Sequence, residues 1–143
     1  MEKINILFVC RYNRFRSRIA EAYFNQINKN KKIKAKSAGL IKGNPLSLKT
    51  VKLLKNMGID ISGNPKGLSS KLMAWQNYAI IVADDVPEQV FDRNIKYCKK
   101  VEVWKIKDLE YENEKGNESR MIDTANTIKD KINDLIKRKL KNE

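Results

Sequence analysis

The feature that most constrains this chain is the segment Cys10–Ser17, with sequence CRYNRFRS. The apolar run Ile4–Val9 precedes it, and the amphipathic pattern Ile19–Phe24 follows it. We therefore predict a strand, a short loop and a helix, with a cysteine where the strand ends and an arginine six residues later. Such a loop gathers a thiol, a guanidinium and backbone N–H groups around one small volume, which suits a tetrahedral oxyanion.

The spacing is selective, because Cys98 has Trp104 at the offset where Cys10 has Arg16. A cysteine at a strand end can simply be a small buried residue. Here a helix N-terminus and the cation of Arg16 would both stabilise the reactive thiolate, so we favour a nucleophile. The planar guanidinium of Arg16 could hold two phosphoryl oxygens. The alternative is an ordinary solvated residue, but a cation in the first helical turn would oppose the helix dipole, so we favour the anion-binding interpretation. Ser17 is a plausible N-cap of the helix that follows.

Hydrophobic periodicity along the chain predicts alternating strands and helices, and thus an α/β fold of three layers. Four parallel strands would form an open sheet with helices on both faces. The expected strands are residues 3–9, 33–38, 78–83 and 99–104; the expected helices begin at Ser17, Leu46, Leu68, Pro87 and Ser119. Ligands of such sheets bind beyond the carboxyl ends of the strands, which is where Cys10 would lie.

Composition removes several other chemistries. The chain has no histidine and only two cysteines, so it cannot build a Ser-His-Asp triad, a Cys-His dyad or a zinc site of the usual kind. We expect no metal and no cofactor. No apolar run approaches the roughly 20 residues that span a bilayer, and Met1–Lys3 does not begin a signal-peptide pattern. We therefore expect one domain over residues 1–143, cytoplasmic and without a membrane partner.

The formal net charge is +13, which favours acidic partners. Most of the lysines fit solvated helix faces, and this is the interpretation we favour for them. The densest group could do more, but it lacks interleaved aromatic residues and fits no nucleic-acid motif, so a nucleic-acid partner is not expected. This group consists of Lys29, Lys31, Lys32, Lys34 and Lys36.

Three segments together resemble the low-molecular-weight protein tyrosine phosphatases, a superfamily that includes thioredoxin-coupled arsenate reductases. They are Val9–Ser17, Ala20–Ala22 and Ser37–Gly39. The resemblance implies the phosphatase fold, a Cys10 nucleophile and an Arg16 that binds the phosphoryl group. It also implies a hydrogen bond between Asn13 and Ser37, which would make both residues supports, and a Ser17 hydroxyl that donates to the thiolate.

The resemblance further implies a general acid in a late Asp-Pro loop, where Asp108 lies in this chain. Sequence alone would not select Asp108, and Asp84 and Asp85, after the third strand, are the alternatives. Tyr111 could stack on an aromatic substrate or only pack the loop. The remaining loop side chains would shape substrate binding: Arg11, Tyr12, Asn13, Arg14, Phe15 and Ser17.

Four residues depart from the family pattern: Tyr12 for Gly, Phe15 for a second loop cysteine, Arg18 for Pro, and Leu109 for the Pro of Asp-Pro. Phe15 rules out a disulfide between Cys10 and that position. Leu109 weakens the assignment of Asp108, while the others bear on specificity.

We interpret the chain as a cysteine-dependent phosphomonoesterase. Its substrate would be a phosphorylated protein, which would make it a protein tyrosine phosphatase, or a small aryl phosphate. Phosphate, sulfate and vanadate would bind as site anions. One alternative is an arsenate reductase, which would need an external thiol because only Cys98 is available as a further cysteine. The other is a non-catalytic module that binds phosphate or phosphoproteins.

Overall fold

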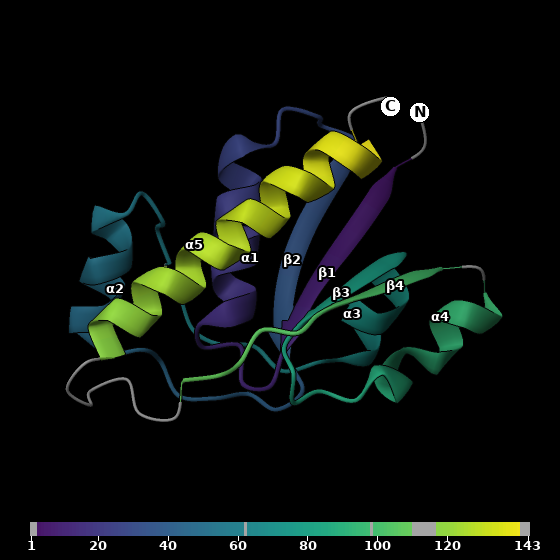
Figure 1. Ribbon diagram of the computed structural model, residues 1–143. Helices are drawn as coiled ribbons and strands as arrows, with labels where there is room; N and C mark the ends of the chain where they lie inside the picture. Colours follow the sequence, from purple (N-terminus) through teal and green to yellow (C-terminus); the bar gives the residue numbers. More distant parts are fainter. Residues whose placement is uncertain (1–2, 62, 98, 110–116, 141–143) are drawn as a thin grey trace.

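The computed structural model describes residues 3–61, 63–97, 99–109 and 117–140 (Figure 1). Four parallel strands form one sheet in the order β2-β1-β3-β4. The strands are β1 (Ile4–Cys10), β2 (Ile33–Gly39), β3 (Tyr78–Val82) and β4 (Lys100–Trp104). The helices are α1 (Arg16–Ile27), α2 (Leu48–Asn56), α3 (Ser70–Trp75), η1 (Glu88–Phe91), α4 (Asp92–Lys96), α5 (Asn117–Leu135) and η2 (Ile136–Leu140). The predicted α/β class, with a four-stranded open parallel sheet, is confirmed.

Alternation along the central strands explains the layers. In β1, Ile6 and Phe8 face one apolar core, whereas Leu7 and Val9 face the other. Helices α1 and α5 cover the first face, and α3 and α4 lie on the opposite side (Figure 1). Both faces of β1 are therefore apolar, as expected for a central parallel strand.

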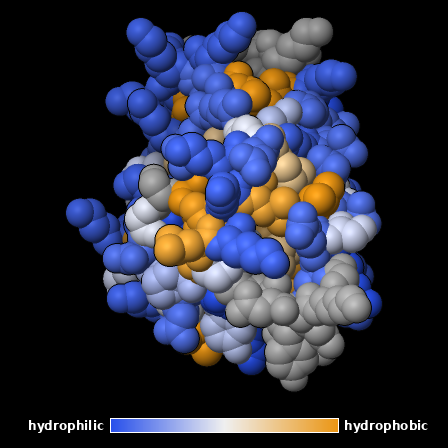
Figure 2. All heavy atoms as spheres, turned by 90° about the vertical axis from the view of Figure 1, so that its left-hand side faces the viewer, coloured by the Kyte–Doolittle hydropathy of each residue, from blue (hydrophilic) through white to orange (hydrophobic). Residues whose placement is uncertain are grey.

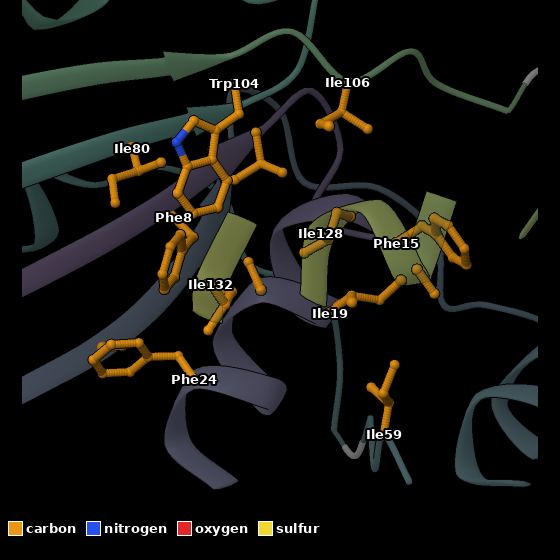
Figure 3. Packing of buried hydrophobic residues seen from close by; sticks show 14 of the residues in the cluster. Phe8, Phe15, Ile19, Phe24, Ile59, Ile80, Trp104, Ile106, Ile128 and Ile132 are labelled. Atoms are coloured by element: carbon orange, nitrogen blue, oxygen red, sulfur yellow. The ribbon is translucent and has the colours of Figure 1, made fainter. Parts of the chain in front are cut away.

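The larger core lies between the sheet and the helices α1 and α5. Figure 3 shows Phe8 of β1 between Phe24 of α1 and Trp104 of β4, with ring centroids 6.1 and 5.9 Å from that of Phe8. Ile128 and Ile132 of α5 pack onto the same cluster. Tilted aromatic pairs at these separations add specific contacts to the burial of apolar area.

Each of the five predicted helix starts differs from the observed one by one or two residues; α3 begins at Ser70 instead of Leu68, and η1 at Glu88 instead of Pro87. Ser17 is not the N-cap of α1, because Phe15 holds that position and the Ser17 side chain bonds elsewhere. Helix α2 begins two residues later than predicted, since the Ser47 hydroxyl accepts from Thr50 N and caps it. Helix α5 begins at Asn117, two residues earlier than predicted. The predicted end of α2 is confirmed by Gly58, whose φ of 82° suits glycine.

Two of the five lysines in the group at residues 29–36 lie on β2, an edge strand of the sheet, and the other three precede it. Lys34 and Lys36 are exposed and alternate with Ile33 and Ala35, which face the core. Lys36 Nζ lies 4.6 Å from the ring centroid of Trp75. Charged residues on an edge strand oppose pairing with other chains, which accounts for part of this group.

No helix within the described parts of the chain is long and apolar enough to cross a membrane. The longest, α5, has a buried stripe of Met121, Ala125, Ile128, Ile132 and Leu135, as its periodicity predicts. Its remaining residues are mainly polar.

The carboxylate of Glu102 joins β3, β4 and η2. Its Oε1 accepts from Tyr78 at 2.8 Å, and its Oε2 accepts from Trp104 Nε1 and from Arg138 at 2.9 Å. Burial pushes the pKa of Glu102 up, but the three donors outweigh burial and leave it below its usual value. The pKa of Tyr78 is raised, by burial first and then by Glu102.

Replacing Glu102 with Gln should therefore lower the free energy of unfolding at neutral pH, by about 1 kcal/mol after solvent screening. A lowered folded-state pKa gives stability that is present above the unfolded pKa and is lost as the pH falls through the folded one. The difference from wild type should thus shrink at pH about 3. Urea denaturation at both pH values measures it, with Glu88→Gln, an exposed site, as control. An equal difference at both pH values would contradict the prediction.

Candidate active site

The loop between β1 and α1 is held from behind by residues 40–43, whose N–H groups donate to its carbonyl groups. The bonds are Leu40 N to Cys10 O, Ile41 N to Arg11 O and Gly43 N to Tyr12 O, at 2.9, 2.9 and 3.0 Å. No described peptide is cis, and in a trans peptide the N–H points opposite to the C=O. The N–H groups of residues 11–13 consequently point away from residues 40–43, toward the inside of the loop.

Two glycines permit this close approach. A Cβ on Gly39 would lie 2.6 Å from Tyr12 C and 2.7 Å from Asn13 N, both backbone atoms. A Cβ on Gly43 would lie 2.7 Å from Tyr12 Cβ. The loop can thus pack against the backbone of residues 39–43 only because Gly39 and Gly43 lack side chains.

Asn13 fixes the middle of the loop. Its φ of 54° lies in the left-handed region, which Asn tolerates better than most residues. Its Oδ1 accepts from Lys66 N at 2.8 Å, which orients the amide. Its Nδ2 then donates to Ser17 Oγ at 2.8 Å and to Ser37 Oγ at 2.9 Å, the second being the bond that the resemblance implies.

The same network reaches the cysteine. Ser37 donates onward to Glu21 Oε1 at 2.7 Å, and Ser17 Oγ lies 3.0 Å from Cys10 Sγ. Because Ser17 Oγ accepts from Asn13, its own proton is available to donate to the sulfur. Cys10 is only 2% exposed, at the end of β1. The nearly buried thiol therefore has a directed hydrogen-bond donor.

Arg16, the first residue of α1, is 1% exposed. Its Nη1 donates to Ile106 O at 2.8 Å, and its Nη2 lies 3.0 Å from Asp85 Oδ1. The buried Nε has no hydrogen-bond partner among the described residues. A guanidinium held on one side, with a free donor on another, is prepared to accept an oxyanion.

Three carboxylates from two segments surround this guanidinium. Asp84 and Asp85 follow β3, and Asp108 follows β4. Asp108 Oδ2 lies 3.6 Å from Arg16 Nη2, and Asp84 Oδ1 lies 3.8 Å from Nη1. Asp108 Oδ1 also accepts from Leu109 N at 2.9 Å. The structure thus brings both the selected aspartate and its two alternatives beside Arg16.

A pocket of about 590 Å³ opens above Cys10. Its polar lining includes the aspartates with Arg11, Arg14 and Lys107, and its apolar lining includes Phe15, Leu46, Leu109 and Met121. Leu46, Lys107 and Met121 were not anticipated as lining residues. Met121 could have been assigned only to the core from its place in the α5 stripe.

The remaining side chains of the loop between β1 and α1 have their own contacts. Arg11 Nε donates to the Tyr12 hydroxyl at 3.1 Å, and this bond raises the pKa of Arg11. Arg14 donates to Asn44 O at 2.6 Å and to Pro45 O at 3.2 Å. Phe15 is 6% exposed, packs into the core and also lines the pocket.

Arg18, which replaces the family proline, is 6% exposed and donates to Gly63 O at 3.2 Å. Tyr111 and Cys98, which the sequence singled out, lie outside the described residues.

Comparison with known proteins agrees with this arrangement. The profile of the family described as "Low molecular weight phosphotyrosine protein phosphatase" matches residues 5–142. The chain belongs to this family. A search of curated proteins found no match.

Several solved structures are similar over almost the whole chain. The low molecular weight protein tyrosine phosphatase from T. tengcongensis is 29% identical, with a TM-score of 0.72 and coverage of 95% of this chain and 99% of that one. The YwlE arginine phosphatase from Geobacillus stearothermophilus is 18% identical, with a TM-score of 0.72 and coverage of 94% and 92%. An arsenate reductase from Archaeoglobus fulgidus is 24% identical, with a TM-score of 0.62 and coverage of 90% and 98%. Phosphatases and reductases thus share this fold.

Gly39→Ala should disturb the loop, because the new methyl group meets backbone atoms that cannot move aside. We expect a loss of about 1–3 kcal/mol in the free energy of unfolding, measured by urea denaturation. The matched control is Gly67→Ala, since Gly67 forms a bridge with Gly39 but its Cβ would meet nothing closer than 3.5 Å. Equal stability of the two variants would show that the close approach does not matter.

Proposed function

We propose that this protein is a cysteine-dependent phosphomonoesterase that hydrolyses an aryl phosphate, such as phosphotyrosine in a protein. The observation that carries the proposal is the convergence of three groups on one pocket: Cys10, the Arg16 guanidinium and the Asp108 carboxyl. The nucleophile, the anion-binding group and the acid come from β1, α1 and the segment after β4, which are distant in sequence.

In the first step, the Cys10 thiolate attacks phosphorus while the bond from phosphorus to the leaving oxygen breaks. Asp108 gives its proton to that oxygen, so the leaving group departs as a neutral phenol. The N–H groups of residues 11–13 and Arg16 stabilise the charge on the other phosphoryl oxygens. Ser17 donates to the sulfur and stabilises the thiolate before attack.

In the second step, water attacks the cysteinyl phosphate. The Asp108 carboxylate takes a proton from that water, the bond from sulfur to phosphorus breaks, and inorganic phosphate leaves. Cys10 is restored as a thiolate and Asp108 as an acid, so the cycle closes without another reactant.

Anion binding by this loop has support among the similar structures. One is described as an arsenate reductase in the phosphate binding state, and another as a YwlE arginine phosphatase with a phosphorylated active site serine. We expect phosphate, sulfate and vanadate to occupy the same place in this chain. The apolar lining of Leu46, Leu109 and Met121 would then face the substrate's leaving group, which favours an aryl ring over a sugar.

Two other functions would use the same loop. An arsenate reductase needs further thiols, and Cys10 is the sole cysteine that lines the described pocket. An external thiol would have to complete that cycle, so this function is the less favoured. A non-catalytic binding module would bind phosphate with no turnover, and the assay below distinguishes it.

The wild-type protein should hydrolyse p-nitrophenyl phosphate in the presence of EDTA, and vanadate should inhibit it. Cys10→Ser should reduce kcat to background, because a serine hydroxyl is a far weaker nucleophile than a thiolate. Release of p-nitrophenol measures both. Turnover no faster than that of Cys10→Ser would overturn the proposal, and arsenate-dependent thiol oxidation without phosphate release would favour the reductase.

Asp108→Asn should lower kcat for p-nitrophenyl phosphate by about 10²–10⁴-fold, because the leaving oxygen then lacks a proton donor. Asp84→Asn is the matched control, since it removes the same charge near Arg16 and should leave most of kcat. Asp85→Asn tests the remaining alternative in the same assay. If Asp84→Asn or Asp85→Asn shows the large loss and Asp108→Asn does not, the acid has been assigned to the wrong aspartate.

A further inference from the structure

The side of the pocket nearest α2 carries exposed apolar side chains. Among the described residues, four large apolar side chains are exposed, and three of them are Tyr12, Ile41 and Leu48, at 36%, 54% and 87%. The fourth, Tyr97, follows α4 on another part of the molecule. Leu48 opens α2 and is almost fully exposed, although a leucine in a helix is usually turned inward.

These residues are continuous with the pocket. Ile41 N donates to Arg11 O, and the Arg14 guanidinium bonds to Asn44 O and Pro45 O. Leu46, two residues before Leu48, lines the pocket itself. Residues 41–48 thus run along the pocket from the loop to α2.

The segment that carries these residues is basic. No Asp or Glu occurs between Ala22 and Ile59. Leu48, Lys52 and Lys55 share one face of α2 by their spacing and are all exposed, and Lys49 beside them is exposed too. We define the α2 rim as Tyr12, Ile41, Leu48, Lys49, Lys52 and Lys55. Figure 2, which views the side that carries α2, shows apolar side chains gathered among hydrophilic ones.

We infer that the α2 rim docks the polypeptide around the phosphorylated residue of a protein substrate, and that this polypeptide is acidic with an apolar residue near the phosphate. The inference rests on the proposed function for the placement of the phosphorylated residue above Cys10. The lysines pair with acidic side chains of the substrate, and Leu48 and Ile41 pack against its apolar residue. A small aryl phosphate fills the pocket and does not reach Leu48, so the α2 rim matters only for substrates that extend beyond the pocket.

The test compares three phosphotyrosine peptides and p-nitrophenyl phosphate. The peptides are matched in length and have acidic flanks with one leucine, acidic flanks with that leucine replaced by serine, or basic flanks. kcat/KM is measured for each, and peptide affinity is measured separately by fluorescence anisotropy with Cys10→Ser, which does not turn over. Leu48→Asp and the double variant Lys52→Glu/Lys55→Glu alter the α2 rim. Tyr97→Asp and the double variant Lys31→Glu/Lys34→Glu are the matched controls at exposed sites elsewhere, the second with the same change in net charge as the rim double variant.

We expect wild type to prefer the acidic, leucine-containing peptide over the basic one by about tenfold, and this preference should fall as salt is added. Leu48→Asp and the lysine double variant should each lower kcat/KM for the preferred peptide by about three- to tenfold and leave p-nitrophenyl phosphate unchanged. The control variants should behave as wild type with every substrate.

Equal kcat/KM for the three peptides, or an equal effect of the rim variants and the controls, would overturn the inference. If p-nitrophenyl phosphate is not hydrolysed, the proposed function fails, and the anisotropy measurements still decide whether the α2 rim selects acidic peptides. Equal affinity of the three peptides for Cys10→Ser would then reject the docking surface as well.

Discussion

The rest of the site depends on the guanidinium of Arg16, which is almost fully buried. Burying a full charge is costly unless other charges and hydrogen bonds compensate it. Here the compensation comes from Ile106 O and from carboxylates that follow β3 and β4. The strand order requires this meeting, because parallel strands end at the same edge of the sheet and α1 begins at that edge. The fold thus stabilises Arg16, and Arg16 in turn holds the ends of three elements together.

Backbone hydrogen bonds support the loop between β1 and α1. A loop that presents several N–H groups to one point must direct its carbonyl groups elsewhere. Here these carbonyl groups accept hydrogen bonds from backbone N–H groups of residues 40–43. Gly39 and Gly43 let the two backbones approach, and Asn13 holds the left-handed residue between them. The rigid support of the loop thus lies on β2 and the segment after it, while the reactive groups lie on β1 and α1. The backbone geometry of the loop therefore does not depend on the side chains of Tyr12 and Phe15, which depart from the family pattern.

The sequence predicted those parts of the site that depend on local order. The strand, loop and helix around Cys10 follow from hydrophobic periodicity, and the placement of Asp84, Asp85 and Asp108 at one edge follows from the parallel sheet. Ser17 was misplaced as an N-cap because a serine at a helix start usually caps, whereas here Asn13, itself fixed by Lys66 N, bonds to the hydroxyl first. The carbonyl support from residues 40–43 could not be predicted, since it depends on the distance between two backbones and leaves no periodic signal. Leu46 was assigned to the start of a helix, because its apolar character does not distinguish a residue inside a helix from one that lines a pocket.

The two sides of the site answer to different constraints. Arg16 is buried beside three partly exposed aspartates, so its charge needs these partners and few substitutions of Arg16 are tolerated. The side of α2 is exposed, so substitutions of its lysines or of Leu48 should change the surface without changing the fold. A residue that stabilises the loop therefore cannot easily adapt to a new substrate, whereas a residue of the α2 rim can. Under the proposed function and the docking inference, chemistry and selection of the partner are separated in space, although residues 39–48 connect the two sides in one continuous stretch of chain.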